Sequence, residues 1–135
     1  MASIFETYTS NLGATGITPS QFALLVLDMM RSNSSGGLPG LLDRFRDAGL
    51  DDAVRSWIGN GKNLMLSPQD VERVLGSARI ELLAHKAGVP PKAAAAETAA
   101  LLPQLVDKLT PAGFMPDDDT LGRNFDLLRD KIGML

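Results

Sequence analysis

Apolar residues recur every three to four positions along most of this chain, which is the spacing of one face of an α-helix. The clearest stretch runs from residue 38 to residue 58 and contains two such patterns in succession. The first places Leu38, Leu41, Leu42 and Phe45 on one face, and the second places Leu50, Ala53, Val54, Trp57 and Ile58 on one face. Gly49 lies between them, where a left-handed residue would end the first helix.

Two helix starts share one sequence pattern, Thr-Pro-Ser-Gln at residues 18–21 and Ser-Pro-Gln-Asp at residues 67–70. In each, the hydroxyl caps the helix, proline occupies the first turn and the last residue completes a capping box. Ile17 and Phe22 have the spacing of a hydrophobic staple around the first of these starts. We therefore expect helices from residue 19 to about residue 31 and from residue 68 to Gly76.

The second half of the chain continues the helical spacing. A fifth helix is expected from a Ser77 cap to Gly88, and a sixth from about Pro91 to Leu109. Pro103 lies inside the sixth helix, where the loss of one backbone hydrogen bond predicts a kink.

Residues 110–113 form a predicted turn, and a last helix is expected from Asp119 or Thr120. No window alternates apolar and polar residues as a strand does. The predicted fold is all-α, with about seven short helices and no sheet.

Composition narrows the class of protein. At 135 residues, the chain is expected to form a single helical domain, residues 1–135. It has no cysteine, which excludes thiolate nucleophiles and disulfides and fits a cytoplasmic protein. The formal net charge of −3 argues against a protein whose main role is to bind nucleic acid. No apolar run is long enough to cross a bilayer, so no membrane association is expected.

A group of short motifs resembles a known family. These motifs are Ala48-Gly49-Leu50, Ser56-Trp57-Ile58-Gly59, Leu66-Ser67-Pro68, Leu101-Leu102-Pro103 and Val106-Asp107-Lys108-Leu109-Thr110-Pro111. Together they resemble the bacterial YidB-like family, all-helical proteins of unknown function. The resemblance covers about residues 36–113, so the helix in residues 1–31 and the helix in residues 117–135 are interpreted as additions. It implies a fold and supplies no catalytic or binding residues.

Four features carry candidate chemistry, and each also has a structural interpretation. Trp57 could anchor a partner, but its place on the apolar face favours the core. Residues 59–63, Gly-Asn-Gly-Lys-Asn, could form an anion nest, but a turn with Asn and Gly at positive φ is favoured. His85, the only histidine, lacks metal-binding partners. Asp117-Asp118-Asp119 could bind calcium, although capping of the last helix explains the cluster.

Residues 78–102 have the residue spacing of a helix-turn-helix, with Ala84 four residues before Gly88. In that motif the second helix reads the DNA major groove with polar residues near its start. Here that helix offers only Lys92 as a favourable contact, and Glu97 would repel phosphate. Acidic and basic residues are equally numerous between residues 67 and 110. The motif is therefore interpreted mainly as a packing unit.

No nucleophile, base and orienting group stand out together, so we expect no enzymatic activity, no cofactor and no metal. The favoured hypothesis is a non-catalytic protein-interaction or scaffold domain with an unknown protein partner. A homo-oligomer is a further expectation, because Met29-Met30 and the end of the chain, Ile132-Gly133-Met134-Leu135, could leave apolar surface for a second copy. The alternatives are DNA binding through residues 78–102 and a hydrolase built from dispersed Asp, Ser and His85.

Overall fold

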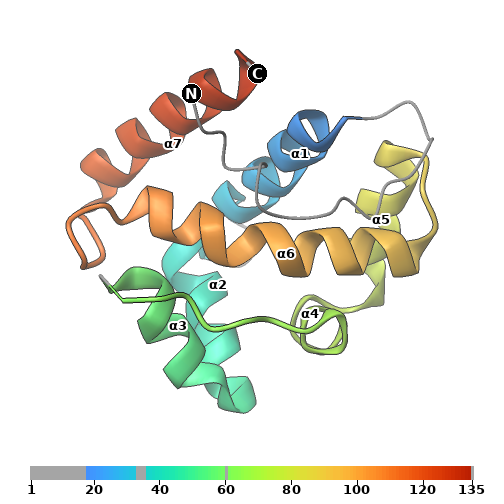
Figure 1. Cartoon of the computed structure of the whole chain (residues 1–135), viewed down its shortest axis with the longest axis horizontal. Coiled ribbons are helices and arrows are strands. Elements are labelled where there is room, and N and C mark those ends of the chain that lie inside the picture. The colour runs from blue at the N-terminus through green and yellow to red at the C-terminus, as the bar shows by residue number, and fades with distance from the viewer. Residues whose placement is uncertain (1–17, 33–35, 60, 135) are drawn as a thin grey trace.

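The computed structural model describes residues 18–32, 36–59 and 61–134, and within these ranges it contains helices and no strand (Figure 1). The expected all-α class is therefore confirmed. The elements are α1 (Pro19–Arg31), α2 (Gly37–Phe45), η2 (Arg46–Leu50), α3 (Asp51–Ile58), α4 (Pro68–Leu75), α5 (Ser77–Ala87), α6 (Pro91–Leu109) and α7 (Asp118–Gly133). None of the helices in these ranges combines the length and the hydropathy needed to cross a bilayer.

The longest helix, α6, holds the others together. Figure 1 shows it running across the molecule, with α1, α5 and α7 on one side and α2, α3 and α4 on the other. It contacts α1, α3, α4, α5 and α7 directly. Its buried residues are Ala94, Ala95, Glu97, Thr98, Ala99, Leu101, Leu102, Pro103, Leu105, Val106 and Leu109. They cover about two thirds of the circumference of the helix. The remaining stripe is half-buried and consists of Ala93, Ala96, Ala100, Gln104 and Asp107.

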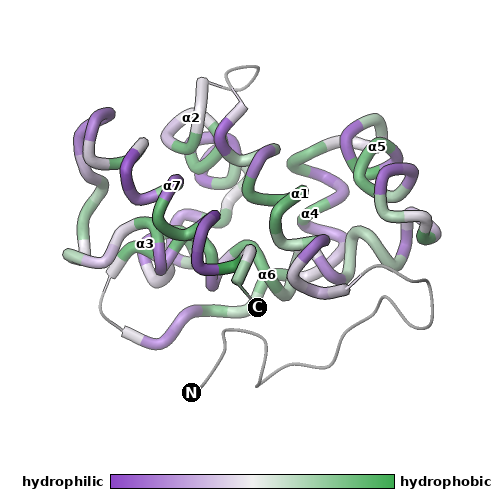
Figure 2. The backbone as a smooth tube through the Cα atoms, turned by 90° about the horizontal axis from the view of Figure 1, so that it is seen from above, coloured by the Kyte–Doolittle hydropathy of each residue, from purple (hydrophilic) through white to green (hydrophobic). Residues whose placement is uncertain are grey.

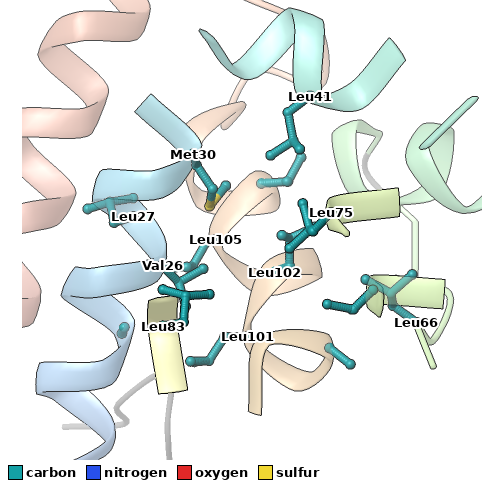
Figure 3. Packing of buried hydrophobic residues seen from close by; sticks show 14 of the residues in the cluster. Val26, Leu27, Met30, Leu41, Leu66, Leu75, Leu83, Leu101, Leu102 and Leu105 are labelled. Atoms are coloured by element: carbon teal, nitrogen blue, oxygen red, sulfur yellow. The ribbon is translucent and has the colours of Figure 1, made fainter. Parts of the chain in front are cut away.

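The core is built from the apolar faces that the periodicity predicts. In Figure 3, Val26 of α1, Leu83 of α5 and Leu101 of α6 lie in one cluster of aliphatic side chains. The alanines in the first half of α6 are small, so neighbouring helices approach it closely and the packing contains few voids. The buried residues of all seven α-helices belong to this one cluster.

Trp57 lies in the core, as its place on the apolar face predicts. Its side chain is 0% exposed, and its ring meets Phe45 edge to face at 5.7 Å between centroids. The indole Nε1 donates a hydrogen bond to the Leu64 carbonyl at 2.9 Å. Ser56 Oγ accepts from the Leu64 N–H at 2.9 Å, so α3 anchors the extended segment that leads to α4.

Most of the predicted helix ends are confirmed. Thr18 caps α1 in a full capping box with Gln21, and Ser67 Oγ accepts from the Asp70 N–H at the start of α4. Gly49 has φ of +89° between α2 and α3, the left-handed conformation expected of a helix stop. Ile17, the other half of the predicted staple, lies outside the described residues.

Two predicted starts are wrong by one or two residues. Gly76, with φ of 86° and ψ of 157°, is the residue that flanks α5, so Ser77 is already helical and does not cap. The last helix begins at Asp118, because the Asp117 side chain accepts from the Thr120 N–H and caps the helix one or two residues earlier than expected. Helix α6 continues through Pro103, and a kink there stays a prediction.

Replacing Trp57 with alanine should lower the free energy of unfolding by about 3–5 kcal/mol, the usual cost of deleting a large buried aromatic side chain. Urea unfolding followed by circular dichroism measures this change. Met65, which is 95% exposed, provides the control, and Met65→Ala should leave the midpoint unchanged. Equal midpoints for Trp57→Ala and the wild type would contradict the packing described above.

Candidate functional site

A groove between α1 and α5 is the candidate binding site. Its volume is about 290 Å³. Helix α1 contributes Leu25, Asp28 and Met29, followed by Ser32 directly after its end, and α5 contributes Arg79, Leu82, Leu83 and Lys86. Each set has the spacing i, i+3, i+4, i+7, so each helix presents one face to the groove. Figure 2 shows α1 lying between α7 and α5, so this groove opens on one flank of α1.

The sequence positions these faces through the residues that point inward. Phe22, Val26 and Met30 turn one side of α1 toward the core, and they are all 0% exposed. Leu25 and Met29 then lie at the edge of the core, where they are half-buried. On α5, Leu83 is buried while Leu82 is 54% exposed. The groove therefore has an apolar floor with an exposed leucine beside it.

Three charged side chains line the groove: Asp28, Arg79 and Lys86. Asp28 forms an ion pair with Arg129 of α7, and both side chains of this pair are exposed. Lys86 is exposed and has no ion pair with any described residue, and Arg79 is half-buried. The wall of the groove therefore carries charges of both signs around its apolar floor.

The two helices of the helix-turn-helix-like segment 78–102 are present as α5 and the first part of α6, and the second one turns polar residues of its first half into the core. Gly88, with φ of +69°, separates α5 from α6 as the sequence predicts. Glu97 and Thr98, in the first half of α6, are 0% exposed. Lys92 is exposed at the start of the helix. Ala93, Ala96 and Ala100, on the remaining face of this part of α6, are half-buried and carry no polar group that could bond a base.

The Gly59–Asn63 loop differs from its predicted conformation. Gly59 has φ of −74° and ψ of −174°, and Gly61 is not among the glycines with positive φ. Positive φ is therefore wrong for both glycines, because the chain leaves α3 in an extended conformation toward Leu64. Asn60 lies outside the described residues, and binding of an anion by this loop stays a prediction.

Two further candidates from the sequence are His85 and the aspartate cluster at residues 117–119. His85 is exposed near the end of α5 and does not line the groove, although the adjacent Lys86 does. Asp117 caps α7, which confirms the capping interpretation. The backbone and side-chain hydrogen bonds from Thr120 hold the pKa of Asp117 below its usual 3.8. In the described ranges, no three His, Cys, Asp or Glu residues are grouped as a metal site requires.

The sequence interpretation missed the α1–α5 groove. Both faces that line it have helical spacing, but they mix apolar and charged residues and so resemble ordinary surface. Leu25 and Leu82 offered a signal, since each widens its helix's apolar face beyond the buried residues. Arg31 was also missed: it pairs with Asp126 at 2.7 Å and lies 5.4 Å from the Phe125 ring centroid, joining α1 to α7.

The fold and the groove define a class: an all-helical protein packed around one central helix, with an open groove between two outer helices. The model of the family described as YidB-like protein matches residues 11–118, and the chain belongs to this family. This match is longer than the range over which the sequence motifs resemble the family, residues 36–113, and it includes α1.

Two known proteins are similar to this chain. The uncharacterized protein YidB of Escherichia coli (strain K12) is 30% identical over 101 residues, which cover 72% of this chain and 76% of that protein. A solved structure of a homeodomain-like protein of unknown function from Shigella flexneri has a TM-score of 0.65 and 28% identity. It matches over 89% of this chain and 91% of its own. Neither name states an activity.

The lowered pKa of Asp117 predicts a pH effect on stability. A depressed carboxylate pKa stabilises the folded state above the unfolded-state pKa, and this contribution is lost as the pH falls through the folded-state value. Asp117→Asn keeps a good capping residue and cannot titrate. We expect the stability of the wild type relative to Asp117→Asn to decrease as the pH falls from about 6 to about 2.5.

Urea unfolding of both proteins across this range measures the difference. Asp119→Asn is the control, since Asp119 lies in the same turn and makes no capping hydrogen bond. A stability difference between wild type and Asp117→Asn that does not vary with pH would contradict the capping role of the carboxylate.

Proposed function

We propose that this protein is a non-catalytic interaction domain that binds a segment of another protein in the α1–α5 groove. The observation that carries the proposal is the groove itself, in which two helices each present four side chains with i, i+3, i+4, i+7 spacing. Grooves between helices with an apolar floor are a common way to bind the apolar face of a partner helix. A cytoplasmic location belongs to the same proposal and is supported by the absence of cysteine.

The chemistry of the groove supports binding rather than catalysis. A hydrolase would need a nucleophile, a base and an orienting group directed at one point. Ser32 and Asp28 line the groove, but His85 does not. Asp28 is held by Arg129 of α7, and Ser32 lies at the end of α1 with its backbone N–H bonded to the Met29 carbonyl. Ser32 and Asp28 therefore suit the role of residues that line a docking site.

Leu82 allows a direct test, because its 54% exposed side chain lies in the groove. A random peptide library displayed on phage is selected against the wild-type protein, and the selected peptides are titrated against variants. Leu82→Asn removes the apolar contact without adding charge, so we expect affinity to fall by about tenfold or more.

Leu127 of α7 provides the matched control, since it is a helical leucine with 65% exposure outside the groove. Leu127→Asn should bind the selected peptides as tightly as the wild type does. The proposal is wrong if the library yields no binder, or if Leu82→Asn and Leu127→Asn weaken the selected peptides equally.

DNA binding is the second candidate function, and the similarity to a homeodomain-like structure favours it. The burial of α6 argues against DNA binding. This helix is the second helix of the helix-turn-helix-like segment, and it is in contact with α1, α3, α4, α5 and α7. Contacts would then have to come from exposed cations such as Lys86 and Lys92.

We expect no retarded complex when the protein is mixed with a random DNA duplex in a gel-shift experiment at about 0.1 M salt. The physical reason is the lack of an exposed basic helix face in the described part of the chain. A complex that weakens steeply with salt and is lost in Lys92→Glu would favour DNA binding over the interaction domain.

A further inference from the structure

We propose that the chain's own N-terminal segment, residues 1–17, docks in the α1–α5 groove, and that a partner binds there by displacing it. This segment precedes the part of the chain that the structure describes and joins it at Thr18. The inference concerns the regulation of the groove and rests on the proposed function. It is carried by the sequence pattern of the segment, the length of its connection to α1 and the position of the groove along α1.

The N-terminal segment contains a short amphipathic pattern. Its larger apolar residues before the first glycine are Met1, Ile4, Phe5, Tyr8 and Leu12. On a helix these five positions fall within an arc of about 100°, and the residues between them are polar apart from one alanine. Thr, Ser and Asn, which supply most of the polar side, are weak helix formers. Such a pattern forms a helix where its apolar stripe can pack against another surface.

The connection to α1 directs this pattern back along α1. Residues 13–17, Gly-Ala-Thr-Gly-Ile, separate the pattern from the Thr18 cap, and their two glycines suit a tight reversal of the chain. Connections between packed helices are commonly about 2–8 residues long, and short ones make the two helices antiparallel neighbours. A helix formed by the pattern is therefore tethered beside α1.

The groove lies at the level along α1 that such a helix reaches. Leu25, the first α1 residue that lines the groove, follows the start of the helix at Pro19 by about 9 Å along the axis. A helix over residues 4–12 is about 14 Å long, so an antiparallel course from the start of α1 takes it past Leu25 to the level of Asp28. Figure 2 shows α7 and α5 on opposite sides of α1, and the groove lies on the α5 side.

The floor of the groove matches an apolar stripe. Leu25 and Met29 are half-buried, and Leu82 is 54% exposed, so their contact with Phe5 and Tyr8 would remove apolar surface from water on both sides. The volume of about 290 Å³ is at the lower limit of ligand pockets and holds a few side chains rather than a whole helix. A short helix that lies across the open side and inserts two or three side chains fits this size.

Charge contributes little to this fit. The amphipathic pattern carries a single charged side chain, Glu6, whereas the groove wall has charges of both signs. The match depends on apolar area and on the tether. A connection of five residues gives the segment a high effective concentration at the groove, so a weak intrinsic affinity is enough for docking.

Docking of the segment lowers the apparent affinity of the groove for a partner. The segment and the partner would contact the same apolar floor, so a partner binds only those molecules in which the groove is open. Loss of the apolar stripe should therefore tighten the binding of a partner segment. The proposed function and this regulation consequently make separate predictions.

A spin label tests the docking in the full-length protein. The chain has no cysteine, so Ser3→Cys, on the polar side of the pattern, provides a single labelling site. A nitroxide at this position should broaden the amide resonances of Leu82 and Lys86 on α5. It should leave sharp the resonances of α3, which Figure 1 shows on the other side of α6. The double variant Phe5→Ser with Tyr8→Ser should abolish the broadening on α5.

The matched control is Thr7→Ser with Ser10→Thr, because both positions lie on the polar side of the pattern and the composition stays the same. This control should keep the broadening. The phage-selected peptides are then titrated against both double variants. We expect them to bind Phe5→Ser with Tyr8→Ser about fivefold or more tightly than the wild type, and the control as tightly as the wild type. Circular dichroism checks that both variants are folded.

The outcomes separate this inference from the proposed function. Broadening on α5 that is no stronger than on α3, or that persists in Phe5→Ser with Tyr8→Ser, overturns the docking, while peptides that depend on Leu82 would still support the proposed function. Equal peptide affinities for the wild type and this variant overturn the displacement. Peptides that bind neither protein overturn the proposed function instead. Broadening that arises only between spin-labelled and spin-free molecules would place the segment in the groove of a second copy and would also overturn the inference.

Discussion

Burial of most of the surface of α6 is the constraint on which the rest of the structure depends. An isolated helix with alanine and leucine around most of its circumference exposes apolar surface on most sides, so other helices must cover it. Helices α1, α5 and α7 cover one side, and α3 and α4 lie against the other. Trp57 and Phe45 extend the same core into the α2–α3 corner, where the indole also fixes the segment leading to α4.

The placement of α6 also bears on the comparison with DNA-reading helix-turn-helix proteins. In those proteins the second helix is held by the first and keeps one polar face for the groove of DNA. Here the corresponding helix has Glu97 and Thr98 buried, while Lys92 and Lys108 near its ends are exposed. The α1–α5 groove lies where two outer helices meet beside the core.

Helix α7 shows how an outer helix is held. Leu121, Phe125, Leu128 and Ile132 provide its buried face, while Arg31–Asp126 and Arg129–Asp28 join it to α1 at the surface. Exposed ion pairs contribute little stability, so the buried face accounts for most of the attachment. The Asp28 pair also lies beside the α1–α5 groove, since Asp28 is one of the residues that line it.

Local signals were enough to predict the helices, their glycine stops and the buried position of Trp57. The boundary at Asp117 could not be assigned because three successive aspartates can each cap a helix. The central position of α6 had a signal in its high content of apolar residues, since residues 93–96, 99–102 and 105–106 are all apolar. The groove could not be predicted, because it depends on how α1 and α5, far apart in sequence, lie against α6.

Native-state hydrogen exchange on the full chain tests the central place of α6 most directly. Amides in the first half of α6, around Glu97 and Thr98, should exchange only through global unfolding and show the largest protection in the protein. Amides of α5 on the groove side should open with a smaller free energy. Exchange of the first half of α6 through local opening, at a free energy well below that of global unfolding, would contradict the structure of the core and restore the helix as a candidate reading surface.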